Sequence, residues 1–158
     1  MSYKNKIQTK LKQFLTQGLS PEKIALTLGF GITLGIFPII GFTSGLCVIC
    51  ASVFRLNQGL LQFINYLIYP LQIVLIIPFF QLGAWVMHDR DFTLNLKTLQ
   101  IKFTTDFINA LNELWTAAWH AALVWLIIAP ILIIIVNKVS LPIIRKVFIK
   151  KSFIKSNL

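Results

Sequence analysis

The sequence predicts an all-α integral membrane protein, and three observations support this fold class. Hydrophobic residues make up 56% of the 158-residue chain and charged residues only 13%, about half the charged share of a soluble domain. Residues 24–54, 60–87 and 114–136 are apolar stretches long enough to reach into or across a bilayer. The net charge of +10 is concentrated at the two ends of the chain. We therefore expect one membrane domain and no second soluble module.

The expected architecture is a broken or re-entrant helical hairpin followed by two transmembrane helices, with an amphipathic interfacial helix at each end. The first interfacial helix is predicted over residues 1–19, where lysines and glutamines fill most positions between regularly spaced apolar residues. A helix with such a basic face favours the surface of an anionic bilayer. Packing of this helix on the cytoplasmic side of the protein itself is the alternative.

The most informative segment is 20–55, because its apolar stretch is interrupted at Gly35–Gly41. Ser20 is expected to cap a first helix, and Thr43 or Ser44 a second. The first helix would be about 21 Å long, shorter than a hydrocarbon core of about 30 Å. A backbone break at membrane depth survives only where protein or water satisfies its polar groups. The break is therefore a candidate functional feature.

The distribution of charge predicts the topology of the chain. By the positive-inside rule, both basic termini are cytoplasmic, and the near-neutral loop 88–112 is external. A re-entrant hairpin over 20–55 agrees with this orientation, because it returns Arg55 to the cytoplasmic side. Two full short crossings of 20–55 also return Arg55 to that side, so this alternative stays open. The expected location is the bacterial inner membrane, with several passes.

The segment 60–87 is predicted to be a transmembrane helix kinked by Pro70 and Pro78. Four of its polar residues recur at spacings of three and four, so one face of the helix is polar. In lipid, a polar face must point at protein or water. We expect it to meet the hairpin break in a polar cleft. The residues predicted to form this cleft are Pro38, Gly41, Thr43, Ser44, Gln62, Asn65, Tyr69 and Gln72.

The last transmembrane helix is predicted over 113–136, followed by a basic cytoplasmic tail, 137–158, that forms the second interfacial helix. Trp85, Trp115 and Trp119 lie where an external aromatic belt is expected. Four alanines on this helix have the spacing that favours close contact between membrane helices. They are Ala117, Ala118, Ala121 and Ala122.

The sequence shows no set of residues for catalysis, so we expect no enzyme activity, no cofactor and no metal. Cys47 and Cys50 form a Cys-x-x-Cys within an apolar helix, without a nearby cation to activate a thiol. His88, Asp89 and His120 are too few and too scattered for a convincing zinc site. Nucleic-acid binding is not expected, because there is no folded basic domain.

Several motifs in this order resemble a bacterial membrane family catalogued as domain of unknown function 2062. They are Gly35–Thr43, Arg55–Asn57, Asn65–Gln72 and Leu82–Gly83. The resemblance covers about residues 21–88 and implies a membrane fold without a defined activity. Members usually carry Asn-Pro-x-Thr in the third motif, where this chain has Tyr69–Gln72, so a role for that pair is not carried over. Some relatives are joined to glycosyltransferase domains, which implies work near lipid-linked sugars.

Two functions follow as hypotheses. The first is a transporter or flippase-like carrier of a small anion or a lipid phosphate, because a helix N-terminus near Thr43 and Ser44 favours an anionic group. The basic ends would gather lipids of the anionic inner leaflet. The second is an accessory or scaffold subunit, perhaps with a glycosyltransferase, whose polar face binds a membrane protein or a second copy. The apolar segments lack ionisable side chains, which argues against a proton-driven pump.

Overall fold

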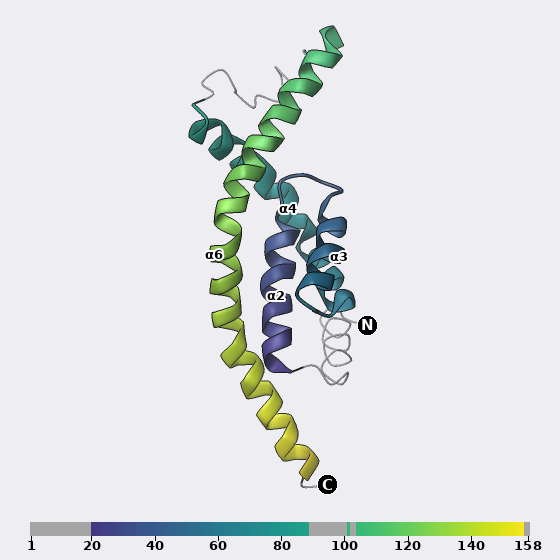
Figure 1. Ribbon diagram of the computed structural model, residues 1–158, viewed down its shortest axis with the longest axis vertical. Helices are drawn as coiled ribbons and strands as arrows, with labels where there is room; N and C mark the ends of the chain where they lie inside the picture. Colours follow the sequence, from purple (N-terminus) through teal and green to yellow (C-terminus); the bar gives the residue numbers. More distant parts are fainter. Residues whose placement is uncertain (1–19, 89–100, 102–103, 157–158) are drawn as a thin grey trace.

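The computed structural model describes residues 20–88, 101 and 104–156, and within them it contains four helices and no strand (Figure 1). The helices are α2 (Pro21–Gly35), α3 (Thr43–Val53), α4 (Gln58–Val86) and α6 (Phe107–Ser156). The predicted interfacial helix over 1–19 and most of the predicted loop 88–112 lie outside the described residues. The prediction of an all-helical fold is confirmed.

The broken apolar segment forms an antiparallel hairpin of α2 and α3. Ser20 caps α2 as predicted, because its side chain accepts a hydrogen bond of 3.3 Å from the Lys23 backbone N–H. The chain turns at Gly41, whose φ of +92° favours glycine. The predicted cap of α3 is wrong: Phe42 holds the N-cap position, and no side chain caps the helix.

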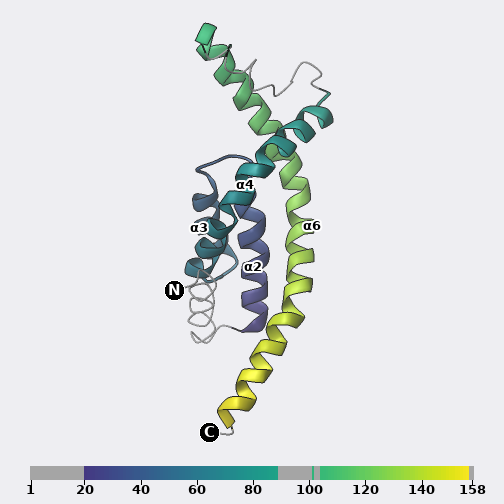
Figure 2. The ribbon, with the colours of Figure 1, turned by 180° about the vertical axis from the view of Figure 1, so that it is seen from behind.

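The two long helices, α4 and α6, are long and apolar enough to span a membrane. They have 29 and 50 residues, or about 44 Å and 75 Å of helix. Figures 1 and 2 show that α6 runs along nearly the whole height of the molecule, beside the hairpin, and crosses α4 above it. The prolines inside the helices, among them Pro70 and Pro78, do not end these helices.

The helix α6 does not end at residue 136, where the sequence suggested a boundary between span and tail. It continues to Ser156 and remains attached to the hairpin, because Ile144 packs on the cluster of Ile24, Leu60 and Ile64. The basic composition of the tail changes the polarity of the helix at this point. The helix does not end at this point, because lysine and arginine are good helix formers.

Glycines and alanines allow the helices to approach closely, and the sequence predicts this role for the alanines. A Cβ atom on Gly29 would lie 3.0 Å from the Ile133 carbonyl oxygen, and one on Gly31 would lie 2.8 Å from Ile64 Cβ. The crossing of α4 and α6 depends on Gly83 in the same way. The four alanines predicted for helix contact are all buried. Small residues therefore fix the positions of α2 and α4 against their neighbours.

Replacement of Gly83 by alanine is expected to lower the free energy of unfolding by about 1–2 kcal/mol, because overpacking forces the two helices apart. The new Cβ would lie 2.7 Å from the Ala121 backbone nitrogen. Gly45 is the matched control, because a Cβ there meets nothing within 4 Å and alanine favours a helix. Unfolding in mixed detergent micelles measures both variants. Equal stability of G83A and G45A would contradict the close crossing.

Candidate functional site

A side-chain amide of α4 satisfies a backbone carbonyl in the segment that interrupts the hairpin. Gln72 Nε2 donates a hydrogen bond of 2.8 Å to the carbonyl oxygen of Phe37, within the segment that joins α2 to α3. The Gln72 side chain is only 1% exposed. Because an unpaired carbonyl costs several kcal/mol in an apolar medium, this bond explains how the backbone can leave the helix here.

The other amides of the predicted polar face also point into the protein. Gln62 Nε2 donates to the Ser44 carbonyl oxygen at 3.4 Å, and Asn65 Nδ2 donates to Gln62 Oε1 at 3.5 Å. Both bonds are long and therefore weak. Tyr69 lies apart from them, exposed on the outer side of α4. The structure therefore brings three amides of α4 to the hairpin and leaves the phenol outside.

The remaining residues predicted for the cleft belong to the hairpin turn or follow it directly. Pro38 and Thr43 are buried, Ser44 is half-buried and Gly41 is exposed. No side-chain hydrogen bond caps the N-terminus of α3, although Thr43 and Ser44 are both there. Pro38 lines an apolar groove together with residues of α4 and α6.

Trp125 is a residue of the site that the sequence analysis missed. Its indole Nε1 donates a hydrogen bond of 3.1 Å to the Thr33 carbonyl oxygen of α2. Its ring meets the Phe37 ring edge to face, with centroids 4.8 Å apart. The sequence contained a signal for this residue. Tryptophan favours the membrane surface, yet Trp125 lies in the middle of the apolar run 114–136, where a specific contact would hold it.

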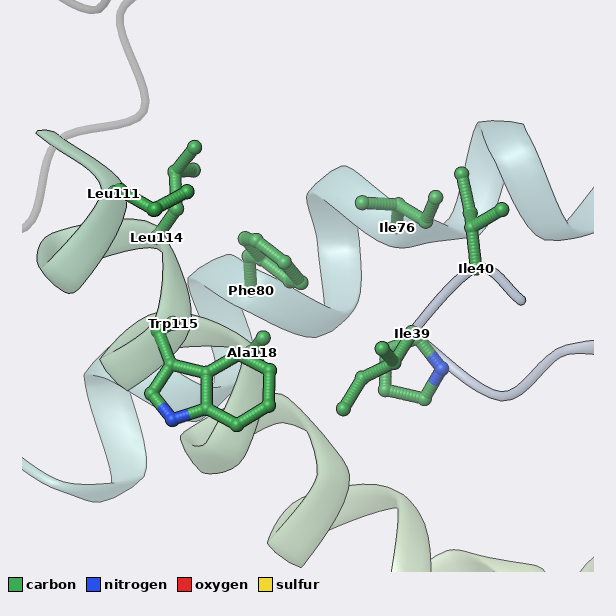
Figure 3. A pocket seen from close by; sticks show the side chains of 9 residues that line it. Ile39, Ile40, Ile76, Phe80, Leu111, Leu114, Trp115 and Ala118 are labelled. Atoms are coloured by element: carbon green, nitrogen blue, oxygen red, sulfur yellow. The ribbon is translucent and has the colours of Figure 1, made fainter. Parts of the chain in front are cut away.

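Two apolar grooves lie along α6. The upper groove, of about 280 Å³, opens between the hairpin turn, α4 and the first turns of α6 (Figure 3). The lower groove, of about 410 Å³, lies between α2, α3 and the middle of α6, and this volume is within the range of ligand sites. The upper groove is lined by Pro38, Ile39, Ile40, Ile76, Phe80, Leu111, Leu114, Trp115 and Ala118. The lower groove is lined by Phe30, Leu34, Cys50, Phe54, Trp125, Leu126, Ala129, Pro130, Ile133 and Ile134.

The contact of Phe37 with Trp125, here called the aromatic pair, lies between the two grooves. Trp125 lines the lower groove, and Pro38, the residue after Phe37, lines the upper one. The indole is also held by its bond to Thr33. The aromatic pair therefore stands next to both grooves, at the level where one ends and the other begins.

The base of the hairpin is held by charged groups. Lys23 Nζ donates to the carbonyl oxygens of Phe54 and Arg55, at 3.3 Å and 3.0 Å, at the end of α3. Glu22 pairs with Arg145 of α6 at 2.9 Å. Backbone hydrogen bonding at the start of α2, and then the Arg145 guanidinium, lower the pKa of Glu22. The pair is therefore kept at neutral pH and is lost as the pH falls through this lowered pKa.

The cysteines and histidines do not form a reactive site in the part of the chain that the structure describes. Cys47 is buried and Cys50 half-buried, and both are free thiols in apolar surroundings. His120 is half-buried on α6, near its crossing with α4. No three His, Cys, Asp or Glu side chains gather into a metal-binding group among the described residues.

A comparison with protein families places almost the whole chain in one of them. The family model of an uncharacterized protein conserved in bacteria, DUF2062, matches residues 4–152. This match extends on both sides of the stretch 21–88 that carries the motifs. No curated protein and no solved structure matches the chain. The chain, with its amide-closed hairpin and two long apolar helices, belongs to the bacterial family DUF2062.

Proposed function

We propose that this chain is a flippase-like carrier of lipid phosphates in the bacterial inner membrane. The observation that carries the proposal is the pair of apolar grooves, which lie at successive levels along α6 and are separated by the aromatic pair. A groove at each level, open to the side, offers acyl chains a site in either leaflet. Movement of the aromatic pair would connect the two sites.

The proposed topology is a re-entrant hairpin with both termini in the cytoplasm. Its turn is bonded to Gln72, in the middle of the 29-residue α4, and contacts the ring of Trp125, in the middle of the apolar run of α6. About 21 Å of α4 continue beyond Gln72. A turn at this level lies near the midplane of a membrane that α4 and α6 span.

The distribution of aromatic and basic residues supports the orientation. Trp85, Trp115 and Trp119 are exposed on the parts of α4 and α6 beyond the hairpin turn. Tryptophan favours membrane surfaces, and basic residues favour the cytoplasmic side. Lys23 and Arg145 lie at the opposite end, at the base of the hairpin. That end is therefore assigned to the cytoplasm.

The acyl chain of a lipid phosphate fits the grooves, whereas a free anion does not. The amides at the hairpin already bond to backbone groups and to one another, and both grooves are lined almost entirely by apolar side chains. Desolvation of a free anion in such grooves would be costly. The acyl chain of a lipid loses nothing there, because its surroundings remain apolar.

A specific observation favours the second function, an accessory or scaffold subunit, perhaps of a glycosyltransferase. Tyr66 and Tyr69 are 64% and 43% exposed on the outer side of α4. At membrane depth, a phenol that faces lipid has no water to bond, whereas a neighbouring helix supplies hydrogen-bonding groups. This face would then bind a membrane protein partner or a second copy of the chain.

The carrier function is tested with the full chain in proteoliposomes that contain a phospholipid labelled with a fluorophore. A membrane-impermeant reductant bleaches the outer leaflet, and exchange between leaflets appears as bleaching beyond one half of the label. We expect exchange with the parent protein, and slower exchange with Leu126→Trp, which fills the lower groove.

Ile127→Trp is the matched control, because Ile127 is the exposed neighbour of Leu126 and does not line the groove. It should exchange lipid at the parent rate. Exchange no faster than in protein-free vesicles would contradict the carrier function. Recovery of a stoichiometric membrane partner from gentle detergent, lost in Tyr66→Phe with Tyr69→Phe, would then support the accessory subunit.

A further inference from the structure

Arg55 occupies a backbone conformation that is costly for arginine. It follows α3 with a φ of +51°, and the Leu56 N–H bonds to the Ala51 carbonyl oxygen at 2.9 Å. This is the bond of a Schellman motif, in which the position held by Arg55 is usually a glycine. Glycine would adopt this φ without strain. The presence of arginine in a strained conformation therefore points to a role for its side chain.

A second cation lies beside Arg55. The Lys23 ammonium bonds to the carbonyl oxygens of Phe54 and Arg55, and it keeps one of its three donors for another group. Phe54 lines the lower groove, with its ring centroid 4.6 Å from that of Phe30. The Lys23 ammonium and the backbone of Arg55 are thereby held next to Phe54, at the basal end of the lower groove.

α6 places a third cation near this end. Ile134 lines the lower groove, and Lys138 follows it by about one helical turn on the same face. Among the described residues, no carboxylate pairs with Lys23, Arg55 or Lys138, since Glu22 is bonded to Arg145. Within the described part of the chain, the apolar groove thus ends near cations that have no carboxylate partner, and such charge is the complement of a phosphorylated head group on an acyl chain.

We propose that Lys23, Arg55 and Lys138 bind the phosphate of an anionic phospholipid whose acyl chain lies in the lower groove. The proposal rests on the proposed function for its orientation and names the lipid class that the carrier takes up from the cytoplasmic leaflet. Cationic side chains attract anionic head groups, and the apolar groove selects a chain over a soluble phosphate.

Fluorescence of Trp125, which lines the lower groove, tests this site at equilibrium. Phenylalanine replaces Trp85, Trp115 and Trp119, so that Trp125 is the only tryptophan left. The protein is placed in phosphatidylcholine vesicles with a small fraction of lipid brominated on its acyl chains, either phosphatidylglycerol or phosphatidylcholine. We expect phosphatidylglycerol to bind preferentially, by about fivefold for each cation that contacts it, and to quench Trp125 more strongly.

The variants separate a specific site from general attraction of anionic lipid. Lys23→Gln with Arg55→Gln should reduce quenching by phosphatidylglycerol to the level of phosphatidylcholine. Lys146→Gln removes an exposed charge of α6 away from the groove and should keep the preference. Equal quenching by the two lipids in the parent, or an equal loss in K146Q, would overturn the proposal.

Arg55→Gly keeps the proposal testable where other variants fold poorly. Glycine adopts positive φ without strain, so the unfolding temperature should stay the same or rise while the preference for phosphatidylglycerol falls. An unchanged preference in R55G would contradict a role for the arginine side chain. Lipid exchange between leaflets is measured in parallel. A preference for phosphatidylglycerol without lipid exchange would refute the carrier function alone, and lipid exchange without this preference would refute the phosphate site alone.

Discussion

Leucine in place of Gln72 is expected to lower the free energy of unfolding by about 2–3 kcal/mol, near the upper end of the cost of an unsatisfied buried group. The substitution removes the amide that donates to the Phe37 carbonyl oxygen. That carbonyl belongs to the hairpin turn, and at the membrane depth proposed for this turn lipid would offer no other donor. Unfolding by sodium dodecyl sulfate in mixed micelles measures the loss.

Gln81→Leu is the control for this prediction, because Gln81 lies on the same helix and is exposed. Removal of its amide leaves no buried carbonyl unpaired, so its stability should change by less than about 0.5 kcal/mol. If Q72L is as stable as Q81L, Gln72 does not hold the hairpin turn, and the explanation of the backbone break fails.

Alanine in place of Trp125 is expected to cost about 3 kcal/mol of stability, at the lower end for a buried tryptophan. The indole loses its contact with Phe37 and its bond to Thr33. An acyl chain can enter the vacated space, because Trp125 lines a groove that opens to the side, and this limits the cost. In the proposed carrier the aromatic pair separates the two grooves, so W125A should also exchange lipid faster in proteoliposomes.

Trp125→Phe separates the two contributions of the indole. Phenylalanine keeps a ring against Phe37 and loses only the N–H bond to Thr33, which should cost about 1 kcal/mol. Lipid exchange in W125F should stay closer to the parent rate than in W125A. A slower exchange in W125A than in the parent would show that the aromatic pair does not separate the grooves.

Local patterns in the sequence were enough to predict much of the fold. Ser20 and Pro21 mark the start of α2, and the interruption at Gly35–Gly41 marks its end, because caps and glycines act within a few residues. The alanines around Ala121 predict a close helix contact in the same way. These signals depend on the backbone nearby, so no knowledge of distant neighbours is needed.

The site depended on contacts that no local pattern contains. Gln72 and Phe37 are 35 positions apart, and Trp125 and Thr33 are 92 positions apart. The polar spacing on α4 predicts that this face avoids lipid, which does not distinguish water in a cleft from backbone groups of a hairpin. In the structure, Gln72 donates its hydrogen bond to a backbone carbonyl of the hairpin. The packing of α4 against the hairpin determines this contact.

Cysteine accessibility in intact cells tests the re-entrant hairpin most directly. Single cysteines replace Ile40 at the exposed turn, Asn109 at the start of α6 and Gln58 at the start of α4, in a chain in which Cys47 and Cys50 are changed to alanine. A membrane-impermeant maleimide should label only the Asn109 position from outside, and the Gln58 position after permeabilisation. Labelling of Ile40 and Asn109 together from outside would mean two full crossings and would contradict the hairpin.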